Sequence, residues 1–196
     1  WVHEGFCTYS EVLYVECMHG YDAMLSYVNN QRRSVRNDKP VIGHYHVNVE
    51  GSSDMYFKGS LMLHTLRSLI EDDKLWFEII KGISNDFKYQ TIDGQDIIDY
   101  INVKSGKDFS NFFSQYLNNK NIPEFEYSLE REGRNTTLVY KWNAIENFNM
   151  PLLIDTGKDD FWIYPTTEFK ELDLGRFDRA DFQIRKDLFF IDVKKQ

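Results

Sequence analysis

Three polar side chains near the start of the chain are spaced for one face of a helix. Glu4, Thr8 and Glu11 follow one another at intervals of four and three residues, so both carboxylates would project from nearly the same side. A carboxylate held in this way can serve a zinc ion as a hard oxygen ligand. Taken alone, each glutamate would more often be an exposed surface residue. The spacing therefore indicates metal chemistry only if a second motif supports it.

A compact Tyr56-Phe57-Lys58-Gly59 segment begins a later helical pattern. The phenol of Tyr56 can donate a hydrogen bond to an oxyanion that develops during hydrolysis. The alternative is a core tyrosine on an apolar helix face. Asp54, two residues earlier, is a candidate N-cap for this helix.

Together, the W-x-x-E-G-F-x-x-Y-x-E pattern of residues 1–11 and the Y-x-K-G pattern of residues 56–59 resemble the gluzincin zinc aminopeptidases of the aminopeptidase N and leukotriene-A hydrolase type. The likeness extends through the helices after residue 58 and the segment 113–117. It implies that Glu4 is the third zinc ligand and that Tyr56 stabilises the oxyanion. It also implies that Glu11 accepts a hydrogen bond from a zinc-bound histidine and so orients it. Phe57 stands where the family often has glutamate, which leaves these roles unchanged.

Two parts of the family's site have no counterpart in these residues. The H-E-x-x-H sequence, which supplies two zinc ligands and the general base, would lie about twenty residues upstream of Glu4. The G-x-M-E-N strand, which receives the substrate's free amino group, is also missing. We therefore expect the chain to be a C-terminal piece of a longer enzyme, inactive and without bound zinc when isolated.

The histidines are weaker candidates for metal binding. His3 begins an H-E-x-x-C sequence that imitates a zinc motif, but the position that must be histidine is Cys7. His44 and His46 could face the same side of a strand, yet no third ligand is near in sequence, so we interpret them as residues of a loop that lines or covers the cleft. His64 is expected to be packed rather than catalytic.

Composition limits the classes of protein to which the chain can belong. A net charge of −8 without a basic face argues against nucleic-acid binding. No run of about 18 apolar residues is present, so no segment is expected to span a membrane; a targeting segment would precede these residues. Cys7 and Cys17 lie about 15 Å apart on one helix, too far for a disulfide, and we expect both to be buried.

Helical periodicity runs from residue 1 to about residue 121. After the first helix, the apolar spacing predicts helices over residues 21–36, 54–71 and 73–89. Asp93 and Asp108 are candidate N-caps, and Gly106 is the glycine expected after a helix, which predicts shorter helices at 94–104 and 109–119.

The pattern changes at the polar run and proline of residues 118–123, where we place a domain boundary. Alternation with a period of two over residues 124–130 and 137–142, separated by a turn, predicts a hairpin. Further short strands are predicted at 152–154, 161–164, 167–172 and 188–193. Residues 122–196 are therefore expected to form a small β-sandwich.

The resemblance implies a multidomain α+β fold, in which the helical C-terminal half of a thermolysin-like catalytic domain, residues 1–121, precedes an antiparallel β-sandwich, residues 122–196. The implied activity is zinc-dependent removal of N-terminal residues from peptides. Two alternatives remain, a catalytically dead peptidase-like scaffold and an epoxide hydrolase of the leukotriene-A hydrolase type. Because helices at a cleft floor are normally covered, we also expect an exposed apolar face near Trp1, Phe6 and the helix that bears Tyr56. Such a face predicts either self-association through it or disorder of the first helix and of the loop around His44 and His46.

Overall fold

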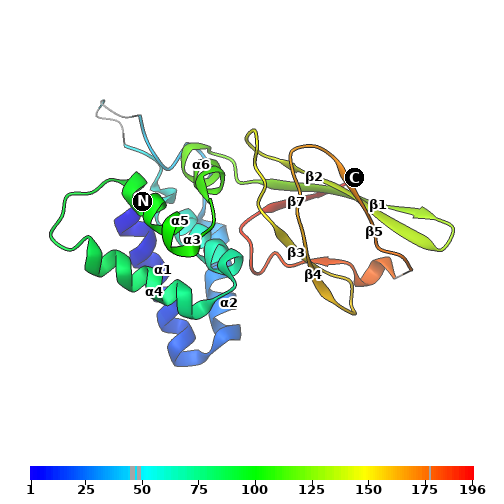
Figure 1. Cartoon of the computed structure of the whole chain (residues 1–196), viewed down its shortest axis with the longest axis horizontal. Coiled ribbons are helices and arrows are strands. Elements are labelled where there is room, and N and C mark those ends of the chain that lie inside the picture. Colours follow the sequence, from blue (N-terminus) through cyan, green and yellow to red (C-terminus); the bar gives the residue numbers. More distant parts are fainter. Residues whose placement is uncertain (45–46, 48–49, 177) are drawn as a thin grey trace.

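Helices form the first part of the chain and strands the last part, as expected for the α+β class (Figure 1). The computed structural model describes residues 1–44, 47, 50–176 and 178–196, so His46 of the histidine pair lies outside the described residues. The helices are α1 Val2–His19, α2 Tyr21–Asn30, α3 Phe57–Ile70, α4 Asp73–Asp86, α5 Gly94–Ser105 and α6 Ser110–Asn118. Short 3-10 turns occur at η1 Gln31–Ser34, η2 Ser53–Met55 and η3 Arg179–Asp181.

Several helix ends follow the chemistry predicted for them. Asp93 forms a capping box with Asp96 at the start of α5, and Gly106 ends that helix with φ 67. Asp108 lies one residue before the N-cap of α6, Phe109, but its carboxylate still accepts the backbone N–H of Ser110 at 2.9 Å.

The N-cap predicted at Asp54 is wrong. α3 begins at Phe57, and Tyr56 is its N-cap without a side-chain cap. Asp54 is buried, and its two carboxylate oxygens accept the backbone N–H groups of Arg36 and Asn37 at 2.9 and 2.7 Å. The Asp54 carboxylate therefore accepts hydrogen bonds from the backbone of a distant loop and does not cap the α3 helix.

The burial predicted for the two cysteines is also wrong, because Cys7 and Cys17 are exposed free thiols. α1 buries a narrow face against α3, formed by Gly5, Thr8, Tyr9 and Val12, and neither cysteine lies on it.

A buried arginine ties three helices together. Arg67 of α3 is 6% exposed and forms bidentate ion pairs with Glu16 of α1 and Asp73 of α4. Its guanidinium also lies over the ring of Phe77, 5.6 Å from the centroid. Because Arg67 binds both acids at once, it fixes the positions of α1 and the start of α4 relative to α3.

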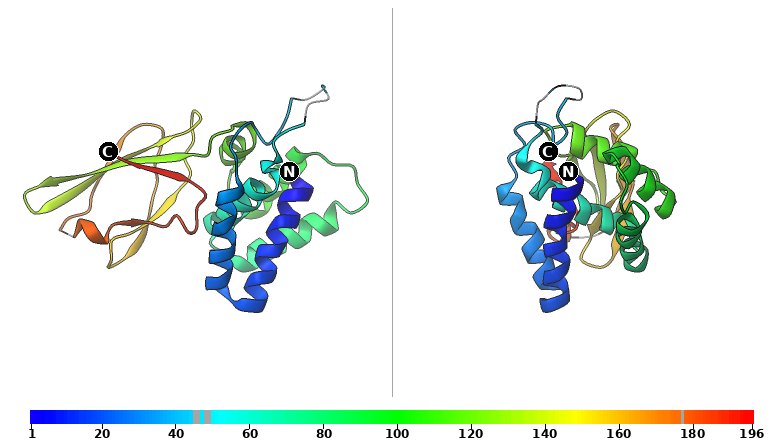
Figure 2. Two further views of the ribbon diagram at one scale, coloured as in Figure 1. Left: turned by 180° about the vertical axis from the view of Figure 1, so that it is seen from behind. Right: turned by 90° about the vertical axis from the view of Figure 1, so that its left-hand side faces the viewer.

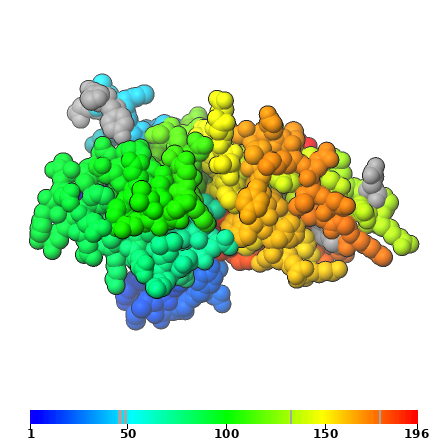
Figure 3. Space-filling model, viewed as in Figure 1, coloured from blue at the N-terminus to red at the C-terminus, as the bar shows by residue number. Residues whose placement is uncertain are grey.

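The strands form two sheets. In the space-filling view the C-terminal part of the chain, coloured yellow to red, lies beside the part that forms the helices (Figure 3). One sheet has the order β5-β2-β1-β7, with β1 Glu124–Glu132, β2 Asn135–Asn143, β5 Lys170–Asp173 and β7 Asp192–Lys195. The other has the order β4-β3-β6, with β3 Leu152–Asp155, β4 Asp160–Ile163 and β6 Gln183–Ile184. The predicted hairpin is present as β1 and β2, while β1 and β7 pair in parallel, unlike the other described pairs.

The strand predicted at 188–193 begins only at Asp192, because the preceding residues contact the helices instead of a sheet (Figure 2). We call residues 186–191 the docking segment. The Thr65 hydroxyl of α3 accepts the Phe190 N–H at 2.9 Å, and the Tyr116 hydroxyl of α6 donates to the Phe190 carbonyl at 2.6 Å. From η1, Arg32 donates to the Phe189 carbonyl at 2.6 Å. The helical and strand regions therefore meet in a buried, hydrogen-bonded contact.

Candidate active site

Two glycines bring the two sequence motifs together where α1 crosses α3. A Cβ atom built on Gly59 would lie 3.0 Å from the Cα of Gly5, and one built on Gly5 would lie 3.4 Å from the carbonyl oxygen of Met55. Such an approach leaves little room for side chains between the helices. Glu4 precedes one glycine and Tyr56 follows Met55, so both predicted site residues lie at this crossing.

Glu4 lies in the first turn of α1 and is partly exposed. Its backbone carbonyl accepts a hydrogen bond from the Thr8 hydroxyl at 2.8 Å. Within the part of the chain that the structure describes, its carboxylate forms no hydrogen bond or salt bridge. Both carboxylate oxygens are therefore free to bind a cation.

Tyr56 sets the start of α3, since its backbone carbonyl accepts the N–H of Ser60 at 2.9 Å. Its side chain is 38% exposed, and its hydroxyl has no hydrogen-bond partner among the described residues. The phenol is thus available to donate to a ligand at the mouth of the crossing.

Glu11 is not brought to this crossing. It is exposed two turns further along α1, where the Tyr27 hydroxyl of α2 donates to its Oε2 atom at 2.9 Å. This hydrogen bond leaves Oε1 without a partner among the described residues. The predicted role of Glu11 toward a metal-bound histidine stays a prediction.

Lys58 contributes to the structure of the crossing in a way that the sequence did not reveal. Its side chain is buried, and its Nζ atom donates to the carbonyls of Asn119 and Lys120 at 3.1 and 2.8 Å. Burial lowers the pKa of Lys58 to about 8, although the nearby Asp54 carboxylate opposes this shift. Lys58 therefore fastens the start of α3 to the chain just after α6. Its place in the Y-x-K-G motif was the signal that could have indicated this role.

The histidines do not join the site. His64 is packed, as expected: its Nε2 atom lies 3.1 Å from the Asp187 carbonyl, and burial lowers its pKa to about 4. His44 is exposed and lines a separate hollow with residues such as Pro40 and Glu50.

A zinc site needs about three protein ligands. Among the described residues, no three His, Cys, Asp or Glu side chains are grouped to hold a metal ion. The unpaired Glu4 carboxylate fits one position of such a site. No helix in the described part of the chain is long and apolar enough to cross a membrane.

Comparison with known proteins identifies the class that this fold and crossing define. The sequence profile of the Peptidase family M1 domain matches residues 1–116, and the chain belongs to this family of peptidases. The resemblance seen in the two motifs is thereby confirmed. No curated protein matches the chain.

Among solved structures, aminopeptidase A of Legionella pneumophila in complex with aspartic acid has a similar fold, with a TM-score of 0.77 at 18% sequence identity. The alignment covers 98% of this chain and 24% of the Legionella chain. The described fold, helices followed by a strand region, thus occurs within an aminopeptidase, and this chain spans about a quarter of the length of that neighbour.

The glycine crossing leads to a first prediction. Gly59→Ala places a Cβ atom 3.0 Å from the α1 backbone, and this overpacking should lower the free energy of unfolding by roughly 1–3 kcal/mol. The higher helix propensity of alanine should offset about 1 kcal/mol of this loss. Gly5→Ala is the matched control, because its Cβ meets only ordinary contacts from 3.4 Å and should be tolerated. Urea unfolding of both variants measures the difference. Equal stability of the two would show that the helices separate easily here.

Proposed function

We propose that this chain supplies one zinc ligand and the oxyanion donor to the active site of a zinc aminopeptidase. Glu4 would bind the metal, Tyr56 would stabilise the oxyanion, and Glu11 would orient a zinc-bound histidine. The observation that carries the proposal is the glycine crossing, where the turn of α1 that bears Glu4 meets the start of α3 beside Tyr56. Membership of a peptidase family and the fold shared with an aminopeptidase support it.

Each residue has a distinct task in this reaction. A bound zinc ion would supply Lewis-acid polarisation of the scissile carbonyl. Tyr56 donates its O–H to the carbonyl oxygen as that oxygen gains negative charge, so its hydrogen bond strengthens toward the transition state. Glu4 contributes negative charge and fixed geometry, because α1 is held against α3 at the crossing. Glu11, in its hydrogen bond with Tyr27, would keep one oxygen for a histidine N–H.

We propose further that residues 1–121 belong to the catalytic domain and residues 122–196 to a β-sandwich that supports it. The change from helices to strands between Asn118 and Glu124 favours this division. The docking segment gives the sandwich its role, since it joins the strand region to the α3 helix.

The remaining zinc ligands and the general base would come from residues outside these 196, which agrees with the 24% coverage of the Legionella enzyme. The free Glu4 and Tyr56 groups favour an enzyme over a catalytically dead scaffold. An epoxide hydrolase would use the same two groups, but no described residue favours it. Self-association through the face near Trp1 and Phe6 stays a prediction, and both residues are already partly buried.

The proposal is tested by comparing this chain with a longer protein that includes it and the upstream metal ligands. The longer protein should bind one zinc per chain and hydrolyse aminoacyl chromogenic substrates, whereas these 196 residues alone should do neither. Metal analysis and initial rates measure both properties. Stoichiometric zinc in the isolated chain, or a longer protein with zinc but no hydrolysis, would contradict the proposal.

A further inference from the structure

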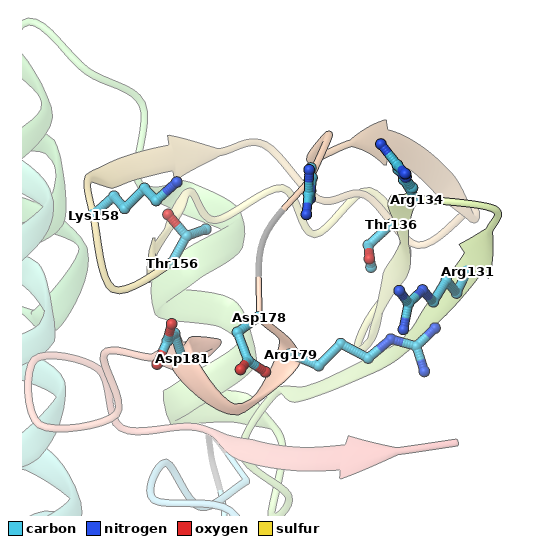
Figure 4. A pocket seen from close by; sticks show the side chains of 9 residues that line it. Arg131, Arg134, Thr136, Thr156, Lys158, Asp178, Arg179 and Asp181 are labelled. Atoms are coloured by element: carbon cyan, nitrogen blue, oxygen red, sulfur yellow. The ribbon is translucent and has the colours of Figure 1, made fainter.

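A cavity of about 720 Å³ opens in the strand region, between the hairpin of β1 and β2, the β3–β4 turn and the η3 turn (Figure 4). Both sheets contribute to its walls. It shares no residue with the crossing that carries Glu4 and Tyr56. We call it the arginine cavity, because it is lined by the cations Arg131, Arg134, Lys158, Arg176 and Arg179.

Among the residues that the structure describes, no acid pairs with these cations, although the chain carries 31 acidic residues. Arg131 donates through Nε to the Gly133 carbonyl at 3.2 Å, and among the described residues the cavity's cations form no salt bridge. Elsewhere in the strand region cations do find acids: Arg185 pairs with Asp160 and with Asp187. Five cations against two aspartates leave the cavity wall with an excess of positive charge, so a bound anion would stabilise this arrangement.

Two aspartates also line the cavity. The Asp178 carboxylate accepts the backbone N–H of Ala180 at 3.0 Å and caps η3. Asp181 lies against the β3–β4 turn, where a Cβ on Gly157 would meet its Cβ at 2.7 Å. In Figure 4 the side chains of Arg131 and Arg179 extend toward one another, on the other side of the cavity from Lys158 and Asp181. The arginine side is therefore open to an anion without a competing carboxylate between its guanidinium groups.

We propose that the arginine cavity binds a ligand through its phosphate groups. Planar guanidinium groups hold phosphate oxygens with paired hydrogen bonds, and several arginines together suit a ligand with more than one phosphate. The hydroxyls of Thr136 and Thr156, also on the cavity wall, add neutral hydrogen-bonding groups. The volume lies within the range of small-molecule sites, roughly 300–1,000 Å³. This role is independent of the proposed peptidase activity.

Isothermal titration of the whole chain with pyrophosphate, at constant ionic strength, tests the proposal. Arg131→Gln and Arg179→Gln should each weaken binding about tenfold, the loss expected for one charge-assisted hydrogen bond. Arg33→Gln, an exposed arginine of η1, is the matched control and should bind like the unaltered chain. Circular dichroism of each variant excludes loss of folding, and Lys158→Gln provides a further variant on the opposite wall.

A second arm distinguishes the sources of phosphate. Flotation with phosphatidylcholine vesicles containing a phosphoinositide identifies a lipid headgroup if the same variants lose vesicle binding. Binding of pyrophosphate without vesicle binding identifies a soluble phosphate compound. The proposal is overturned if neither probe binds or if only an acidic peptide binds. It is also overturned if Arg131→Gln and Arg179→Gln bind pyrophosphate as well as the control Arg33→Gln does.

Discussion

Tyr56→Phe in the longer zinc-binding protein is expected to lower kcat by about 10²–10³ while the zinc content stays the same. Removing the phenolic oxygen deletes a hydrogen bond that is strongest when the carbonyl oxygen carries negative charge. The ring remains, and its packing at the start of α3 is preserved. Steady-state kinetics with metal analysis on the same samples measures both quantities.

Tyr14→Phe is the matched control for this experiment, because Tyr14 is 64% exposed and lies on α1 about two and a half helical turns beyond Gly5. It should leave kcat and zinc content unaltered. An unchanged kcat in Tyr56→Phe, or loss of zinc in that variant, would remove Tyr56 from the role of oxyanion donor.

Glu4→Gln should remove zinc and hydrolysis together. The substitution keeps the size of the side chain but replaces a charged oxygen ligand by a neutral amide, and a site with one ligand fewer binds zinc poorly. Because the Glu4 carboxylate forms no hydrogen bond or salt bridge in the described fold, the free energy of unfolding of the metal-free protein should fall by no more than the roughly 0.3–1 kcal/mol of an acid in the first turn of a helix. Glu78→Gln, at an exposed glutamate of α4, is the control. Full zinc occupancy in Glu4→Gln would show that another residue is the ligand.

Contrasting results for the two substitutions separate their roles. Loss of kcat with zinc retained assigns an oxyanion donor, and loss of both assigns a metal ligand. Equal zinc loss in Tyr56→Phe and Glu4→Gln would instead indicate that the crossing acts only as a structural support.

Local chemistry allowed much of the fold to be predicted. Periodicity located the helices and the hairpin, and the capping box at Asp93 and the glycine at 106 followed from short-range rules. The predictions were wrong where contacts between residues far apart in the sequence determine the local structure. Asp54 binds backbone some 17 residues away, and the docking segment contacts α3 and α6 across 125 and 74 residues of sequence.

The candidate site was predictable to a different degree for each residue. The motifs indicated Glu4 and Tyr56 as site residues. The contact between the glycines of the two motifs depends on the tertiary structure, so residue spacing could not predict it. The partners of Lys58 and of Arg67 lie on other elements, so their roles appear only after folding. The arginine cavity was missed for the same reason, because its cations come from separate stretches of an acidic chain.

The docking segment also bears on the order in which the protein can mature on the ribosome. Its hydrogen bonds to Thr65 and Arg32 span 125 and 157 residues of sequence. The helices must therefore emerge first, with the surfaces of α3 and α6 that contact the docking segment uncovered, until that segment has left the ribosome. A nascent chain stalled before residue 186 would present that surface to chaperones.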